Sequence, residues 1–268
     1  MSETTATTPA PRRPTWIAEL RYLLFLVAGV FALHSLVARP FYIPSESMMP
    51  TLLVGDRLVV SKYPYGWSYA SPSVALLPFL KGRLFGRTPR RGDIVILTPT
   101  APDRRDEILI KRVIGLPGDT VQMVRGRLWL NGRPVPAVDE GMRPMAVDGN
   151  TPCAGEQVDG TCRVHVVRET LPGGASYATL DLGDSRLDDT PATRVPAGQV
   201  FVMGDNRDNS ADSRVSSSEG GLGGPVPVET IGGRAEFITF SMNGTAGWNP
   251  LSWLHAFRGE RAGRDLRP

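Results

Sequence analysis

Two serines and one lysine are the residues best suited to chemistry. Ser45 and Ser47 lie two positions apart in the segment PSESM, and Lys111 lies in the segment ILIKRVIG. In a proline-bounded loop, one hydroxyl could attack a carbonyl while the other hydroxyl and a backbone N–H bind the developing oxyanion. A serine nucleophile needs a base. A lysine can act as that base only while its amine is neutral, a state that arginine does not reach at any working pH.

The histidines are poorly placed for the familiar histidine-assisted triad. His34 lies in an apolar run, His165 lies in a segment that reads as an insertion, and His255 lies near the C-terminus. None of them is well placed to serve the polar loops, so a histidine base is not predicted.

The local pattern around Lys111 leaves two interpretations open. Strand alternation would place Lys111 and Arg112 on opposite faces. An ordinary lysine is neutral only about once in 2,500 at pH 7, and burial lowers the pKa by several units. By itself, however, the pattern is more typical of a lysine whose stem covers a strand edge while its head stays in water. Likewise, Ser-x-Ser is common in ordinary loops.

The segment GDNRDNSADSR, residues 204–214, concentrates side chains that form hydrogen bonds. This density suits a buried polar network, and the alternatives are a calcium-binding loop or a solvated turn. The spacing lacks the glutamate that an EF-hand loop requires at its twelfth position. No cofactor and no metal are predicted.

Four segments in order, PSESMMPTLLVGD, RRGDIVI, IKRVIGLPGD and GDNRDNSADSR, resemble those of the bacterial type I signal peptidases, or leader peptidases. The resemblance covers roughly residues 40–132 and 197–240. It implies a Ser–Lys serine endopeptidase in which Ser47 is the nucleophile and Lys111 the general base. It also implies that the Ser45 hydroxyl and the Ser47 backbone N–H form the oxyanion hole.

The same resemblance implies roles for six further residues. Ser210 and Asp212 would orient the lysine or support the site, and Met48 would line the substrate pocket. The implied salt-bridge partners are Arg112, Asp205 and Arg214. The implied activity is removal of N-terminal signal peptides from exported preproteins through an acyl-enzyme. The implied partners are those signal peptides, the lipid bilayer and, as a further candidate, the protein-export machinery.

An apolar run near the N-terminus would anchor this chemistry to a membrane. The seventeen residues from Tyr22 to Ala38 carry no formal charge, which is at the lower bound of about 17–25 residues for a spanning helix. We predict a cytoplasmic tail at 1–15 and a transmembrane signal anchor at 16–38. A buried core helix is the alternative. A cleavable signal peptide is disfavoured because Leu36 occupies the −3 position relative to Ala38, where a small residue is needed.

Charge around the run predicts its orientation. Arg12, Arg13 and Arg21 precede it while Arg39 follows it, which favours a cytoplasmic N-terminus. Together with the resemblance to bacterial signal peptidases, this orientation implies the bacterial inner membrane as the location, with a single span and the catalytic domain on the periplasmic side.

The remaining residues predict a mainly β fold. Short apolar runs separated by turn signals, such as Asn131-Gly132, indicate antiparallel strands. We expect a catalytic β core at 39–132 and 197–245, interrupted by a smaller inserted β domain at 133–196. The C-terminal tail at 246–268 is either surface-active or disordered.

The two cysteines bracket a polar stretch rich in turn residues. Cys153 and Cys162 suit a local disulfide in an oxidising compartment, and the alternative is two unpaired buried thiols. Without neighbouring histidines they make a poor zinc site.

Other protein classes fit the sequence less well. The net charge of +3 and the scattered arginines do not predict a nucleic-acid partner. A LexA-like self-cleaving protease would normally carry a DNA-binding head in place of the anchor. A peptidase specialised for pilin or conjugation proteins remains open. An inactive membrane-tethered binding module is disfavoured because both Ser47 and Lys111 are present.

Overall fold

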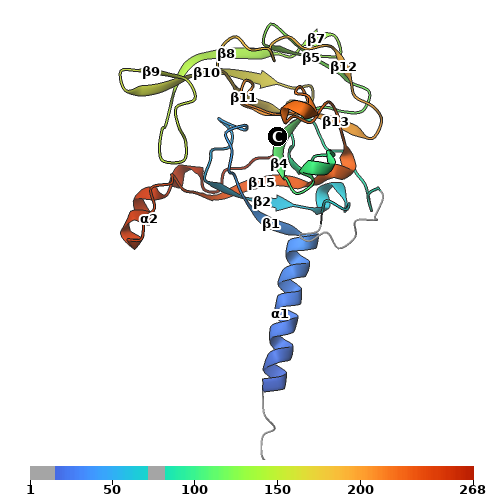
Figure 1. Cartoon of the computed structure of the whole chain (residues 1–268), viewed down its shortest axis with the longest axis vertical. Coiled ribbons are helices and arrows are strands. Elements are labelled where there is room, and N and C mark those ends of the chain that lie inside the picture. The colour runs from blue at the N-terminus through green and yellow to red at the C-terminus, as the bar shows by residue number, and fades with distance from the viewer. Residues whose placement is uncertain (1–15, 72–81) are drawn as a thin grey trace, which may run out of the picture.

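The computed structural model describes residues 16–71 and 82–268, so the predicted cytoplasmic tail at 1–15 lies outside the described residues. A single long helix leads into a β-rich body (Figure 1). This confirms the predicted fold class, a mainly β protein with an apolar N-terminal helix and an antiparallel core.

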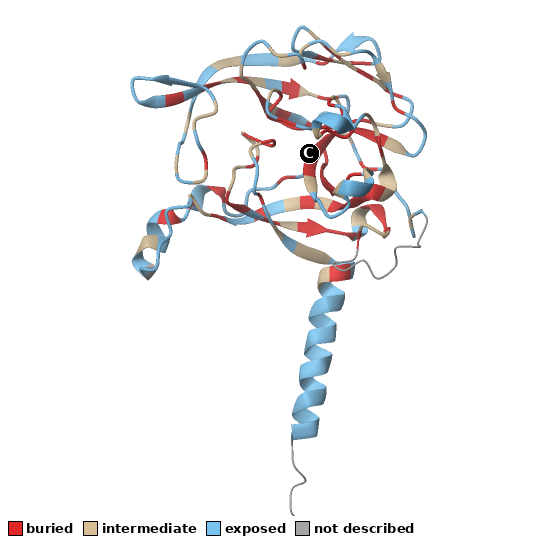
Figure 2. Ribbon diagram, viewed as in Figure 1, coloured by how far each residue is buried: buried red, intermediate tan, exposed pale blue. Residues whose placement is uncertain are grey.

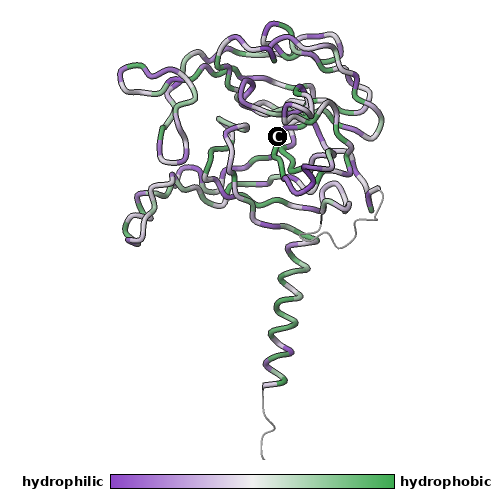
Figure 3. The backbone as a smooth tube through the Cα atoms, viewed as in Figure 1, coloured by the Kyte–Doolittle hydropathy of each residue, from purple (hydrophilic) through white to green (hydrophobic). Residues whose placement is uncertain are grey.

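The helix α1 (Trp16–Leu36) is long and apolar enough to cross a membrane by length and composition. Its 21 residues rise about 32 Å, close to the thickness of a bilayer's hydrocarbon core. Its side chains are exposed along almost the whole length, and Figures 2 and 3 show this exposed surface to be largely apolar. The helix ends at Leu36 and Ala38 already pairs with Ser61, so the predicted end of the anchor at 38 is two residues too late.

The largest sheet in the described residues is antiparallel, in the order β1-β2-β15-β3-β4-β13-β14. Its central strands β3 and β4 are buried on both faces, which explains their nearly continuous runs of Val, Ile and Leu. The bounds of its strands are β1 (Ala38–Tyr42), β2 (Asp56–Ser61), β15 (Ile231–Ser241), β3 (Ile94–Leu97), β4 (Leu109–Gly115), β13 (Gln199–Met203) and β14 (Val226–Pro227).

Two smaller antiparallel sheets complete the β structure of the described residues. One has the order β11-β10-β8, with β9 also paired to β10, and the other has the order β12-β5-β6-β7. Their bounds are β8 (Ala137–Met145), β9 (Glu156–Val158), β10 (Thr161–Thr170), β11 (Ser176–Asp181), β5 (Thr120–Val124), β6 (Arg127–Leu130), β7 (Arg133–Pro134) and β12 (Thr193–Arg194). Both β7 and β12 fall within the segment predicted as an insertion, yet they pair with β6 and β5, which were predicted as core.

The C-terminal segment packs on the main sheet. After β15 the chain forms α2 (Pro250–Ala256) and then returns, with Asp265 bridging to Phe237 and Leu266 buried in the core. A disordered tail, one of the two predicted alternatives, is therefore wrong for this segment. The short 3-10 helices are η1 (Tyr63–Tyr65), η2 (Pro102–Arg104), η3 (Ser217–Glu219), η4 (Val228–Thr230) and η5 (Gly259–Arg261).

The loop between β1 and β2 is held between two apolar clusters. Met48 is fully buried among core residues such as Leu52 and Leu58, while the adjacent Met49 packs with Cys162 and the β10–β11 sheet. Two consecutive side chains thus fix this loop between the main sheet and the smaller one. Ser47 immediately precedes them.

Candidate active site

Ser47 and Lys111 meet in the interior of the protein. Ser47 lies on the loop between β1 and β2, and Lys111 lies on β4 next to Val95 of β3. The Lys111 Nζ donates a hydrogen bond to Ser47 Oγ at 2.8 Å. The two residues are only 3% and 8% exposed. The fold therefore brings together a hydroxyl and an amine that are 64 residues apart in sequence.

Burial changes the acidity of the lysine. Loss of hydration lowers the pKa of the Lys111 amine to about 8, against the opposing attraction of Asp212 and Asp205. A pKa of about 8 leaves roughly one lysine in ten neutral at pH 7, compared with about one in 2,500 for an ordinary lysine. The site therefore supplies much of the shift that a lysine base requires.

Both nearby carboxylates are engaged by their own arginines. Asp212 receives hydrogen bonds from Arg214 Nε at 3.0 Å and Nη2 at 2.9 Å. Asp205 receives two from Arg112, at 2.8 Å and 2.6 Å. Desolvation opposes the charge of Asp212, but Arg214 outweighs it, so the pKa of this carboxyl is lowered. Since each carboxylate already has a guanidinium partner, neither forms a direct ion pair with Lys111 among the described contacts.

The 204–214 loop attaches through the backbone to the loop that carries Ser47. The Asn206 N–H donates to the Ser47 carbonyl at 3.1 Å, and Asn206 Nδ2 donates to the Glu46 carbonyl at 3.4 Å. Asn209 Nδ2 reaches the Glu46 carboxylate at 3.1 Å. These contacts, which the sequence analysis did not assign, fix the position of Ser47. Their only sequence signal was the density of amide side chains in the loop.

Gly204 permits the two loops to approach closely. A Cβ at this position would lie within 3.0 Å of both the Ser47 carbonyl oxygen and Ser210 Oγ. The Ser210 hydroxyl is buried and has no hydrogen-bond partner among the described residues. The structure thus places Ser210 beside the backbone of the nucleophile, and its predicted role in orienting Lys111 stays a prediction.

Ser45 is exposed two residues before Ser47 on the same loop. Neither the Ser45 hydroxyl nor the Ser47 N–H bonds to another described residue. Both donors are therefore free to meet an added oxygen atom. The oxyanion hole stays a prediction.

Met48 is completely buried in the core cluster beneath the nucleophile loop. Its contacts are those of a packing residue that holds the loop, and its predicted place in the substrate pocket stays untested.

A further packing contact involves Arg112, whose guanidinium lies 4.1 Å from the centre of the Tyr177 ring on β11.

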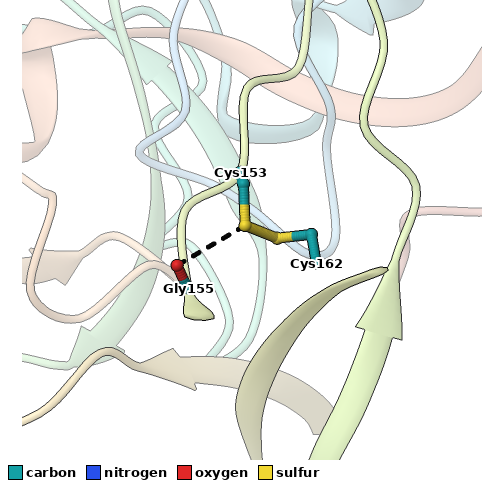
Figure 4. The surroundings of a disulfide bond; sticks show 3 residues. All are labelled: Cys153, Gly155 and Cys162. Carbon is teal, nitrogen blue, oxygen red and sulfur yellow. Dashed lines mark hydrogen bonds between the residues drawn. A yellow bond between two sulfur atoms is a disulfide. The ribbon is translucent and has the colours of Figure 1, made fainter. Parts of the chain in front are cut away.

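A disulfide joins Cys153 and Cys162, whose Cα atoms lie 5.5 Å apart (Figure 4). Cys162 lies on β10, so the bond ties the loop before β9 to the sheet that packs on Met49. The Gly155 carbonyl approaches Cys153 Sγ at 3.4 Å. Elsewhere in the described residues, no group of three or more His, Cys, Asp or Glu side chains is arranged to hold a metal.

A buried ion pair beyond the site could not be predicted from the sequence. Arg207 donates to the two carboxylate oxygens of Glu169 at 2.7 Å and 2.6 Å, and Tyr177 donates to the same carboxylate at 2.9 Å. Arg207 belongs to the 204–214 loop, whereas Glu169 and Tyr177 belong to the β10–β11 hairpin. The sequence around Glu169 contains no motif that predicts this contact.

The protein is mainly β and buries a serine hydroxyl against a lysine amine. A family profile described as signal peptidase, peptidase S26, matches residues 16–240. The chain therefore belongs to the signal peptidase family and is a serine endopeptidase, a hydrolase that acts on peptide bonds.

Two relatives at more than 30% identity agree with this assignment. Signal peptidase I of Rickettsia typhi is 35% identical over 231 residues, which cover 83% of this chain and 80% of the relative. Signal peptidase I of Rickettsia canadensis is 32% identical over 270 residues, 94% of each chain. A crystal structure of a signal peptidase I from Enterococcus faecalis has 24% identity and a TM-score of 0.29, and the match covers 55% of this chain and 97% of that one.

Proposed function

We propose that this peptidase removes signal peptides from exported preproteins with Ser47 as nucleophile and Lys111 as general base. The observation that carries the proposal is the 2.8 Å contact between Ser47 Oγ and the buried Lys111 Nζ. When the amine is neutral, it accepts the Ser47 proton as Oγ attacks the carbonyl carbon of the scissile bond. The resulting oxyanion would accept hydrogen bonds from the Ser47 N–H and the Ser45 hydroxyl.

The rest of the cycle uses the same amine. Protonated Lys111 donates its proton to the leaving nitrogen, which releases the mature protein and leaves the signal peptide as an ester on Ser47. Neutral Lys111 then takes a proton from a water molecule as the water oxygen attacks the ester carbonyl. The ammonium returns this proton to Ser47 Oγ as the ester bond breaks, which frees the signal peptide with a new carboxyl group. This sequence is the acyl-enzyme route of serine hydrolysis.

We further propose that α1 crosses the inner membrane with the N-terminus in the cytoplasm and the β body outside. The exposed apolar surface of α1 supports the span, and the disulfide between Cys153 and Cys162 supports an oxidising compartment for the body. Signal peptides emerging from the bilayer would then be the substrates, and the protein-export machinery would be a neighbour. Protease added from the cytoplasmic side should spare residues 40–268.

Two substitutions test the catalytic assignment. Ser47→Ala and Lys111→Met should each lower cleavage of a preprotein in detergent by at least about 100-fold, because each removes one partner of the proton transfer. Ser218→Ala, at an exposed serine of η3, should retain activity. Circular dichroism must show that all three variants are folded. Full activity in either site variant would refute the assignment.

A further inference from the structure

A cavity that does not include Ser47 or Lys111 lies beside the end of α1. It has a volume of about 560 Å³ and is lined by residues of β1, β3 and β15, by the segment after β2 and by the loop that leads into β4. Three of its lining residues are cationic, namely Arg39, Lys62 and Arg105. The only carboxylate among the described residues that line it is that of Asp106.

No carboxylate forms an ion pair with the cations of this cavity in the described part of the chain. Arg39, Lys62 and Arg105 form no ion pair there, and residues 72–81 contain no Asp or Glu in their sequence. Lys62 is only 1% exposed, and its Nζ donates to the backbone carbonyl of Ser71. A buried ammonium without an anion is costly. The cavity is therefore short of negative charge.

The electrostatics of Lys62 agree with that deficit. Burial, and then the charge of Arg39, lower the pKa of Lys62 to about 8. At pH 7 a group with this pKa is still protonated about nine times in ten. An anion entering the cavity would meet more than one positive charge.

Hydrogen bonds fix the cavity to the end of α1. The Lys62 N–H donates to the Val37 carbonyl at 2.8 Å, and Trp67 Nε1 donates to the Leu36 carbonyl at 2.8 Å. Arg39 follows Leu36 by three residues, a reach of at most about 10 Å. The polar layer on each side of a bilayer is about 5–8 Å thick. If α1 spans the membrane, this cavity lies at the level of the lipid headgroups.

We propose that this cavity binds the phosphodiester of a membrane phospholipid headgroup. The cations Arg39, Lys62 and Arg105 suit the phosphate, and Tyr69, Thr98 and Thr100 add hydroxyl groups to the lining. Ile96, Leu97 and Ile108 add aliphatic surface that suits the first carbons of an acyl chain. The inference rests on the proposed placement of α1 in the membrane, but it does not depend on catalysis by Ser47.

The test measures lipid retention by the full-length protein in detergent, by native mass spectrometry with added phosphatidylglycerol. The double variant Arg39→Gln with Arg105→Gln should raise the dissociation constant for the lipid at least tenfold. The matched control is Arg127→Gln with Arg133→Gln, which removes two exposed arginines from the β6–β7 hairpin on the far side of the body from α1 (Figure 1). This control should bind as the wild type does. Diacylglycerol, which lacks the phosphate, should not be retained.

Three results would overturn the proposal. The first is equal retention of phosphatidylglycerol by the double variant and the wild type. The second is a protein that inorganic phosphate stabilises only when Arg39 and Arg105 are present, although its lipid retention does not need them. This result would indicate a site for free phosphate. The third is a double variant that retains lipid as the wild type does but binds a synthetic signal peptide more weakly. This result would indicate a peptide-binding site. Lipid retention needs no turnover, so the measurement can be repeated in Ser47→Ala. This repeat separates a failure of the lipid-binding proposal from a failure of the catalytic proposal.

Discussion

The Lys111 amine illustrates how burial tunes a residue for chemistry. Its position on β4, between buried strands, removes water, while the nearby carboxylates that would restore its charge are occupied by Arg112 and Arg214. Desolvation therefore dominates, and the amine loses its proton far more readily than an exposed lysine does.

The pH dependence of cleavage should report this shift directly. Protonated Lys111 cannot accept a proton, so kcat/KM should fall at low pH, rise about tenfold per pH unit, and level off above a midpoint near the lysine pKa of about 8. The measurement is cleavage of a synthetic signal peptide in detergent between pH 5.5 and pH 10 under sub-saturating conditions. A midpoint near 10.4, the ordinary lysine value, would show that Lys111 is not the titrating base.

Gly204→Ala should impair the site without touching a reacting atom. The added methyl group would collide with the Ser47 carbonyl and Ser210 Oγ, so the nucleophile loop must move. A displacement of about 1 Å costs roughly 100-fold in rate, and we expect a loss of this size in kcat. The control is Gly86→Ala, whose new Cβ would meet only ordinary contacts. If G204A and G86A cleave equally fast, close approach at Gly204 is unimportant.

The sequence was sufficient to single out Ser47 and Lys111, whose side chains meet in the structure, but not to predict their surroundings. Both residues lie in segments whose order resembles a known family, whereas neither was convincing from its local pattern. Met48 shows what such a resemblance leaves open, because a residue next to the nucleophile is completely buried in the core. Burial depends on segments far away in sequence, such as Leu58 and Ile238, that pack around it.

At the scale of elements, the β10–β11 hairpin supports the 204–214 loop. Glu169 holds Arg207 by two hydrogen bonds, and Tyr177 contacts both Glu169 and Arg112. Because Arg112 binds Asp205, this cluster joins the hairpin to β4, the strand that carries Lys111. The smaller sheet therefore contributes to the position of the site.

Glu169→Gln should destabilise the protein strongly. The amide keeps the shape of the side chain but leaves the buried Arg207 charge uncompensated, which costs about 3–5 kcal/mol. Denaturant unfolding of the detergent-solubilised protein measures the loss. The control is Glu140→Gln on β8, whose partner Arg168 is half exposed, and it should cost less than about 1 kcal/mol. Similar losses in both variants would mean that burial of the Arg207 pair is not what stabilises the loop.

Alternation and turn signals predicted the strands better than their partners. The β6–β7 hairpin followed from its Asn131-Gly132 turn signal, as did the antiparallel character of the sheets from alternation. The pairing of β12 with β5 could not be predicted, because it joins Thr193 to Val121 across the whole of the intervening β8–β11 sheet. Two-residue strands such as β12 also carry too little pattern to be recognised.

At the scale of the whole molecule, the chain returns to the main sheet at its end. Arg261 of η5 binds the buried carboxylate of Asp56 on β2, and Arg258 binds Asp148 in the loop after β8. These contacts attach the segment after α2 both to β2 and to the loop that follows β8. Composition alone suggested a free tail, because the ion-pair partners lie about 110 to 205 residues earlier in the sequence.

The return of the chain leaves α2 and its flanks as an exposed apolar projection. Leu251 and Leu254 are 66% and 74% exposed, Trp253 is 58% exposed, and Trp248 is fully exposed. Figure 1 shows α2 extending toward the side of the body from which α1 leaves, so both helices would face one bilayer. Of the two alternatives for the tail, surface activity is the one that this geometry favours.

Deletion of residues 1–33 should therefore leave a body that still binds phospholipid vesicles. Binding strength scales with the apolar area that enters the interface, so Trp253→Ser with Leu254→Ser should weaken partitioning at least about tenfold. Vesicle sedimentation measures the effect in the truncated protein. The matched control is Val138→Ser with Met142→Ser, at exposed positions of β8 on the opposite side of the body (Figure 1).

The comparison of the two double variants determines what holds the body to the membrane. If only the Trp253→Ser, Leu254→Ser variant is released from the vesicles, α2 attaches the body to the membrane independently of α1. The two helices together then restrict the tilt of the active site over the bilayer. If the β8 variant is released equally, binding depends on general surface hydrophobicity instead. If the truncated body does not bind at all, α1 alone holds Ser47 near the membrane, and the ten residues from Ala38 to Ser47 set its height.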